Sequence, residues 1–436
     1  MKHYTPSEIA EVLAKFAPEK IQMLLEPSVG NGNLLTPFLM REGIQQIVAI
    51  DKDPSAIEDL CKLHEGRHDI TFVNDDFLEW SLPSKENTLF DCVVMNPPFM
   101  AKNKSLIKTD LKQEMISAKK HEKHLPMEVV FVLRAIRLLK DRGKLLAIVP
   151  ASVVNASKMS WLRDYLLSQG HIERVYELPR YTFEGIEAKT FLLVFVKGQE
   201  AKSSVLAMYD NGNTQEEIIP REEIEKDLRL DYSYFAAKRE FEKYQSTPGL
   251  EWVPLGKIAS TSRGKVPAPP SDADVIHYTH FANGFWRLPD NNGQGMPRRL
   301  SDILICKRVG RDCLSTYGLG INFKGVRFSD CVVTIQIQDK AIDKIALLFA
   351  LRTFFLLPGI QSLLKLGTGA SYISELQLRQ TCIPLGLHTA EPELYREYQK
   401  AVRKFNYDKM KHLEGIAAAK IIEYAEVSCL DAVSTM

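Results

Sequence analysis

The stretch FDCVVMNPPFM ends a strand-like apolar run with residues that can do chemistry on an amine or an amide. The run stops at Asn96, and Pro97, Pro98 and Phe99 follow it. Because proline fixes φ, the Asn96 side-chain oxygen and the Pro97 carbonyl are held as two rigid acceptors for the N–H bonds of one nitrogen. The Phe99 ring can stack on a planar group beside them. The corner therefore predicts a site that presents a planar amine or amide to a group donor.

Three earlier strand-like runs end in residues that could hold such a donor. Gly30 and Gly32 follow the first run, and Asp51 ends the second about 20 residues later, where a carboxylate can accept both hydroxyls of a ribose. Asp76 and Phe77 end the third run, where the carboxylate can receive an adenine amino group and the ring can line the pocket. Taken alone, each acidic residue is better explained as a helix cap or a residue of a solvated turn. Three strand ends in succession favour a binding site.

The first loop selects among nucleotide ligands. It lacks the third glycine of the dinucleotide fingerprint, and Glu26 stands where a pyrophosphate would be repelled. This argues against NAD. An acidic residue here suits a ligand with a positively charged amino acid part and an adenosine part, which describes S-adenosylmethionine.

The elements that must position these residues alternate between strand-like and helix-like patterns over residues 7–196. Residues 7–17 have helical spacing after a Ser cap, and residues 129–143 read as an amphipathic helix. Strands that alternate with helices predict an α/β fold with a doubly wound, mostly parallel, Rossmann-like sheet. Ligands then bind at the carboxyl ends of its strands, where Asn96 would lie.

The rest of the chain predicts a second domain of mixed α+β type. The expected organisation is a catalytic domain at 1–200, a polar connection at 201–250, a target-recognition domain at 251–390 and a helical segment at 391–436.

The order of the motifs resembles the gamma class of DNA adenine-N6 methyltransferases, whose amino-terminal segment and cofactor motifs precede the catalytic motif. The motifs are YTP (4–6), EPSVGNG (26–32), AIDKDP (49–54), NDDF (74–77) and NPPF (96–99). The family usually has Tyr at the last position, and Phe keeps the stacking face. The resemblance covers roughly residues 1–200 and implies methyl transfer from S-adenosylmethionine to the N6 amino group of a flipped adenine.

The resemblance also assigns site residues. The cofactor-binding residues it implies are Thr5, Pro6, Glu26, Pro27, Gly30, Gly32, Asp51, Lys52, Asp76, Phe77 and Asn96. The catalytic residues it implies are Asn96, Pro97, Pro98, Phe99 and Phe183, the last as a second wall for the base. The alternative for Phe183 is a loop aromatic that covers the core.

Charge is distributed unevenly along the chain. Residues 251–436 hold 23 Lys and Arg against 18 Asp and Glu, and residues 257–327 hold 11 against 5. Three stretches, at 254–270, 302–311 and 367–385, look like the target-recognition domains of type I specificity subunits. The DNA-binding candidates are Lys102, Lys104 and Lys108 in the lysine-rich segment 100–126, and Arg263, Lys265, Arg308 and Arg311 in the second domain. A solvated basic face is the alternative for both sets.

Two other classes of function stay open. RNA adenine and protein-glutamine methyltransferases share such a corner, and a DNA-binding specificity protein could keep an inert methyltransferase fold. The seven cysteines form no CxxC pair, so neither a metal site nor a disulfide framework is expected. No signal peptide or apolar span is apparent, which predicts a cytoplasmic location. Double-stranded DNA is the expected partner. A separately encoded restriction endonuclease and the oligomeric state are left open.

Overall fold

The computed structural model describes residues 4–81, 89–98, 105–106, 124–183, 189–210, 213–267, 275–277, 281–282, 285–286, 303–309, 317–319, 327–339, 341–366 and 372–434. The chain forms two compact units, Met1–Tyr232 and Ser233–Met436. Among the described residues, no helix is long and apolar enough to cross a membrane.

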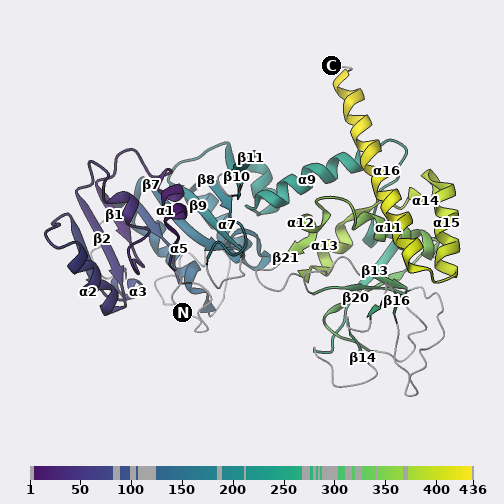
Figure 1. Ribbon diagram of the computed structural model, residues 1–436, viewed down its shortest axis with the longest axis horizontal. Helices are drawn as coiled ribbons and strands as arrows, with labels where there is room; N and C mark the ends of the chain where they lie inside the picture. Colours follow the sequence, from purple (N-terminus) through teal and green to yellow (C-terminus); the bar gives the residue numbers. More distant parts are fainter. Residues whose placement is uncertain are drawn as a thin grey trace. The chain divides into compact units, whose positions relative to one another are not determined.

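The first unit is built on a nine-stranded sheet in the order β11-β10-β8-β9-β7-β4-β1-β2-β3 (Figure 1). The strands are β1 Met23–Glu26, β2 Gln46–Asp51, β3 Ile70–Asn74, β4 Phe90–Met95, β7 Leu139–Pro150, β8 Gly170–Glu177, β9 Thr190–Lys197, β10 Ser203–Asp210 and β11 Asn213–Pro220. Strands β7, β4, β1, β2 and β3 run parallel to one another, whereas β9 runs antiparallel between β7 and β8. The expected α/β class with a large, mostly parallel sheet is confirmed.

The helices of this unit bury their apolar faces against the strands that precede or follow them. They are α1 Ser7–Ala14, α2 Pro54–Leu63, α3 Phe77–Trp80, α5 Met127–Leu138, α6 Ala151–Asn155, α7 Ser160–Gln169 and α8 Arg221–Asp227. Helix α2 packs on β2 and β3, α5 on β7, and α7 on β8. The central strands read as continuous apolar runs because both faces of a parallel sheet are covered.

Three local predictions differ from the structure. Ser7 does not cap α1, since the N-cap position is Pro6 and no side-chain cap bond forms. The helix expected over 129–143 ends at Leu138, and β7 begins at the next residue. The polar stretch 201–250 is not a simple connection, because it adds β10 and β11 to the sheet and continues into helices.

The second unit combines helices with short strands. A four-stranded sheet in the order β13-β20-β17-β18 consists of Ala259–Arg263, Val332–Ile337, Ile303–Lys307 and Tyr317–Leu319. Its main helices are α9 Tyr232–Gln245, which begins at the unit boundary, α11 Lys344–Phe354, α12 Ile360–Leu364, α13 Glu375–Gln380, α14 Leu387–Ala390, α15 Pro392–Arg403 and α16 Tyr407–Ser434. The unit also contains the short helix α10 Leu255–Ile258 and two short strands, β12 Val253–Pro254 and β23 Cys382–Ile383, which pair with each other. Helix α11 is buried along its length and packs against α14, α15 and α16.

Candidate active site at the carboxyl edge of the sheet

The polar residues predicted from the sequence gather at one edge of the first unit's sheet. Glu26 ends β1, Asp51 ends β2, and Asn96 follows β4 directly. These three strands are parallel neighbours, with β1 in register between β4 and β2. Their carboxyl ends therefore meet at the same edge, where ligands bind in open α/β sheets.

A glycine loop after β1 closes onto Asp51. Gly30 and Gly32 have φ of 53° and 80°, in the left-handed region that favours glycine. The Gly30 amide donates to Asp51 Oδ2 at 2.8 Å, and the Asp53 amide donates to Oδ1 at 2.9 Å. A Cβ on Gly32 would meet Leu60 Cδ2 at 2.9 Å. The loop thus holds the carboxylate in one orientation, and a side chain at Gly32 would require Leu60 to move.

Glu26 is a buried acidic residue at the carboxyl end of β1. Its side chain is 1% exposed, and its Oε2 accepts no hydrogen bond from the described residues. Burial, reinforced by the negative charge of Asp51, raises the pKa of Glu26 well above its ordinary value. A buried carboxylate is costly unless it is protonated or paired with a cation, so this position suits the ammonium group of an amino acid.

Asn96 is held at two points by residues that are far from it in the sequence. Its Nδ2 donates to Thr5 Oγ1 at 3.0 Å, and its main-chain carbonyl accepts from Ser28 Oγ at 3.1 Å. Its Oδ1 is buried and has no hydrogen-bond partner among the described residues. The sequence reasoning missed Ser28, because nothing in a serine's sequence context shows which carbonyl it will reach.

The residues flanking Asn96 are placed only in part. Pro97 is buried and Pro98 exposed, whereas Phe99 lies outside the described residues. Lys102, Lys104 and Lys108 also lie outside them.

Asp76 and Phe77 follow the third strand and begin α3. Asp76 Oδ1 accepts from the Leu78 amide at 2.9 Å and so caps this short helix. Phe77 is 2% exposed, and its ring centroid lies 4.9 Å from that of Phe131. The helix-cap reading of Asp76 is therefore realised, and Phe77 packs into the protein interior.

The expected second aromatic wall is buried. Phe183 is 2% exposed and belongs to the apolar core that includes Tyr176 and Leu178. Tyr181, which the sequence reasoning passed over, is 60% exposed at a φ of 66°. The position of Phe183 favours the reading of an aromatic that covers the core.

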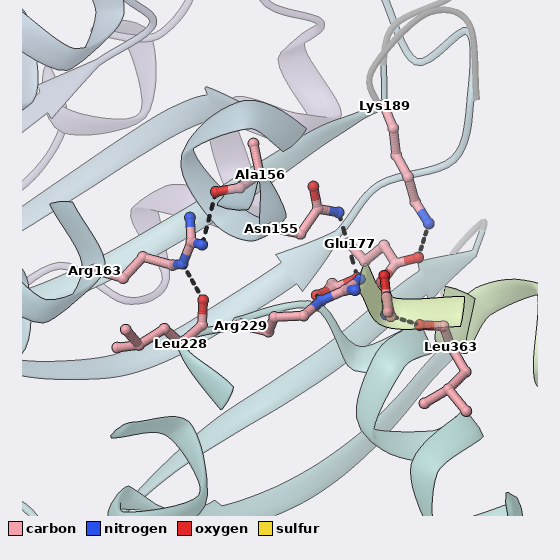
Figure 2. A network of polar contacts seen from close by, with 10 residues as sticks. Asn155, Ala156, Arg163, Glu177, Lys189, Leu228, Arg229 and Leu363 are labelled. Atoms are coloured by element: carbon pink, nitrogen blue, oxygen red, sulfur yellow. Dashed lines mark hydrogen bonds and ion pairs between the residues drawn. The ribbon is translucent and has the colours of Figure 1, made fainter. Parts of the chain in front are cut away.

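A buried polar network lies at the same edge, beyond β7 (Figure 2). Glu177 at the end of β8 pairs with Lys189, which directly precedes β9. Asp231 accepts from Arg229 Nε at 2.9 Å and from Asn155 Nδ2 at 3.4 Å. The network lies where the end of β8, the start of β9 and helix α6 meet the last residues of the first unit.

In the second unit, two of the predicted basic residues meet at one aspartate. Arg263 donates from an Nη to Asp330 Oδ2 at 3.0 Å, and Arg308 Nε donates to the Asp330 carbonyl at 2.6 Å. Partial burial, with the nearby Arg263 charge, lowers the pKa of Arg308. Lys265 is exposed, and Arg311 lies outside the described residues.

Within the part of the chain that the structure describes, no group of three or more His, Cys, Asp or Glu side chains is arranged to hold a metal ion.

Comparisons with known proteins identify relatives among restriction-modification methyltransferases. The type I restriction enzyme MpnII methylase subunit of Mycoplasma pneumoniae is 24% identical over 226 residues, which are 46% of this chain and 41% of that protein. The type II methyltransferase M.TthHB8I of Thermus thermophilus is 29% identical over 206 residues, covering 45% of this chain and 44% of that one. The chain thus covers less than half the length of these relatives. A solved type I restriction-modification methyltransferase subunit from Streptococcus thermophilus is 25% identical, with a TM-score of 0.42 and 52% of each chain covered.

The amino-terminal half carries the family relationship. Residues 2–248, more than half of the chain, match the family described as N-6 DNA Methylase. This segment contains the glycine loop, Asp51 and the Asn96 corner. The chain therefore belongs to the N-6 DNA methylase family.

Proposed function

We propose that this protein transfers a methyl group from S-adenosylmethionine to the N6 amino group of an adenine in DNA. The observation that carries the proposal is the buried Asn96 Oδ1, which accepts no hydrogen bond from the described residues and lies at the end of a strand that neighbours the one ending in Glu26. The position of this oxygen suits acceptance of an N–H bond from a substrate. Family membership supplies the substrate class.

The residues present fit S-adenosylmethionine. Glu26 offers its unpartnered oxygen to the ammonium group, and Asp51, oriented by the Gly30 and Asp53 amides, can accept the ribose hydroxyls. Asp76 stands one strand further along for the adenine amino group. When bound, this cofactor supplies a sulfonium methyl, which is an electrophile.

The chain's own contribution to catalysis is orientation of a weak nucleophile. The lone pair of the adenine amino nitrogen is delocalised into the ring. Asn96 Oδ1 and the Pro97 carbonyl can accept its two N–H bonds, which favours a pyramidal nitrogen with the lone pair directed at the methyl group. The amino proton can leave after transfer, so no strong general base is required. Stacking of Phe99 on the extruded base would contribute roughly 1–3 kcal/mol.

Substrate class separates this proposal from its rivals. Incubation of the protein with labelled S-adenosylmethionine and, in separate reactions, duplex DNA, tRNA or rRNA, and protein should label DNA alone. Labelling of RNA or of a glutamine would support an RNA adenine or protein-glutamine methyltransferase. Absence of any transfer, with DNA binding retained, would indicate an inert DNA-binding protein.

We also propose that the motif order places the chain in the gamma class, and that the second unit reads the DNA sequence. The cluster of Arg263, which ends β13, and Arg308, which follows β17, supports the second point, because neighbouring guanidinium groups suit base edges and phosphates. The proposal also gives Lys265 and Arg311 roles in DNA binding. Lys102, Lys104 and Lys108 are assigned to phosphates, and a separately encoded endonuclease is a proposed partner in a restriction-modification system.

A further inference from the structure

The orientation of the Asn96 amide decides whether the catalytic corner can work. A primary amide has an acceptor end and a donor end, and a half-turn about its last side-chain bond exchanges them. Only the arrangement with Oδ1 facing the site can accept an N–H bond from a substrate amine. Some residue must therefore fix this choice.

Thr5 restrains the amide in this arrangement. The Asn96 Nδ2 group donates to Thr5 Oγ1 at 3.0 Å, and Oδ1 is buried and has no partner among the described residues. Because a hydroxyl can donate as well as accept, this bond holds the amide against rotation, and the N–H bonds of a bound substrate amine favour the orientation with Oδ1 toward the site. The reversed amide would turn a donor toward those N–H bonds.

Thr5 is itself held in place. Its side chain is 5% exposed, and its carbonyl accepts from Asn33 Nδ2 at 2.8 Å in the glycine loop. Pro6 follows it, and α1 begins at Ser7. Because its backbone is constrained in this way, the Thr5 hydroxyl group is a hydrogen-bond partner of fixed position for the Asn96 amide.

We propose that Thr5 is a positioning residue for methyl transfer, which orients the Asn96 amide through a hydrogen bond from Nδ2. This inference deepens the proposed function and rests on the assignment of Asn96 to the target amine. It differs from the sequence-based expectation, in which Thr5 contacts the cofactor. Together with the bond from Ser28 to the Asn96 carbonyl, it ties the catalytic corner to the loop that holds the donor.

The test compares Thr5→Val with Thr5→Ser, measuring kcat, the KM for duplex DNA and the dissociation constant of S-adenosylmethionine. Valine keeps the shape and removes the hydroxyl, whereas serine keeps the hydroxyl. We expect Thr5→Val to lower kcat by about tenfold or more, as for loss of one orienting hydrogen bond. The donor dissociation constant should stay within about twofold, and Thr5→Ser should retain most of kcat. Thr71→Val, on the exposed side of β3, is the matched control.

Two results would overturn the inference. One is a wild-type kcat in Thr5→Val, and the other is a loss confined to donor affinity, which would make Thr5 a cofactor contact. Thr5→Ala removes the same hydroxyl without the valine branch and gives the same comparison if Thr5→Val does not fold. An Asn96→Ala variant, measured alongside, distinguishes failure of the proposed function from failure of this inference. If Asn96→Ala still methylates DNA, the assignment of Asn96 is wrong. If Asn96→Ala is inactive and Thr5→Val is fully active, only the role of Thr5 is wrong.

Discussion

Asn96 and Glu26 each have a buried side-chain oxygen that accepts no hydrogen bond from the described residues. The ability of these two oxygens to bind a ligand depends on different properties. The amide oxygen of Asn96 is neutral, so its availability depends on orientation. The carboxyl oxygen of Glu26 depends on pH, because burial and the charge of Asp51 raise its pKa. Substitutions at these two positions should therefore produce separable effects.

At Asn96, alanine should abolish methyl transfer and leave donor binding nearly intact. The side chain acts on the target nitrogen, and its hydrogen bond among the described residues goes to Thr5, not to the residues that hold Asp51. Single-turnover methylation of duplex DNA and titration with S-adenosylmethionine measure the two effects. Methylation at the wild-type rate would remove the mechanism. Asp51→Ala serves as the contrasting variant, since it should weaken donor binding.

At Glu26, glutamine should stabilise the protein that is free of donor while it weakens donor binding. A carboxyl group whose folded pKa is raised costs stability as the pH rises from its unfolded pKa of about 4.3 to its folded value. At neutral pH, Glu26→Gln should therefore raise Tm and increase the free energy of unfolding by roughly 1–3 kcal/mol. This increase should shrink as the pH falls toward 4. Donor affinity should fall by roughly 10- to 100-fold. A lower Tm at neutral pH would show that another group already neutralises Glu26.

At the scale of elements, the network of Figure 2 holds strand ends that belong to distant parts of the chain. Asp231 is 4% exposed and lies between Arg229 and Asn155. Burial alone would raise its pKa, but the charge and hydrogen bond of Arg229, with help from Lys189 and Asn155, hold the pKa below its ordinary value. The carboxylate is thus the charged form that the fold requires.

Replacement of Asp231 by Asn should destabilise the protein by about 3–5 kcal/mol at neutral pH, because it breaks a buried ion pair. Because the pKa of Asp231 is lower in the folded protein than in the unfolded chain, the carboxylate stabilises the fold at pH values above its unfolded pKa of about 3.9. This contribution is lost as the pH falls through the folded pKa. The difference between variant and wild type should therefore shrink in acid. Urea unfolding at several pH values measures it. Glu58→Gln, which breaks the exposed pair with Lys62, is the control and should change stability by less than about 0.5 kcal/mol.

Sequence patterns predicted these elements where burial imposes a simple period. The central strands are continuous apolar runs, so their ends, and with them Glu26, Asp51 and Asn96, could be placed at one edge. Strand β11 was read as part of a connection because it is an edge strand whose residues are mostly exposed and polar. The antiparallel insertion of β9 and the bond between Thr5 and Asn96 depend on pairing across long separations, which no local pattern encodes.

At the scale of the whole molecule, chemistry and sequence reading are assigned to different units. In the proposed function, the carboxyl edge of the first unit selects the planar amine, and the reading of the neighbouring bases falls to the second unit. Arg263 and Arg308, which share Asp330 in the second unit, are the described residues that best suit this task. Their division into base-reading and phosphate-binding roles can be measured.

Replacement of a base-reading Arg by Ala should relax the methylated sequence at one position, at a cost of roughly 1–3 kcal/mol. Loss of a phosphate contact should weaken methylation of all sequences alike and lower the salt dependence of binding. Arg263→Ala, Lys265→Ala, Arg308→Ala and Arg311→Ala should be compared by sequencing the methylated sites of a genome that expresses each variant. Arg396→Ala, which removes an exposed arginine of α15, is the control and should leave the methylated sequence unchanged. An unchanged motif and methylation level in all four variants would contradict the assignment.

The sheet order also has a consequence for synthesis of the chain. Strand β1 leaves the ribosome before β4, yet it lies in the interior of the sheet and pairs with β4, with Leu25 opposite Val93. At about 5–20 residues per second, the interval between residues 25 and 93 is roughly 3–14 s, during which β1 can pair only with β2. Folding of the catalytic edge is therefore delayed until the Asn96 corner has emerged. A nascent chain stalled before residue 90 should remain open to proteolysis, with the apolar face of its first strands uncovered.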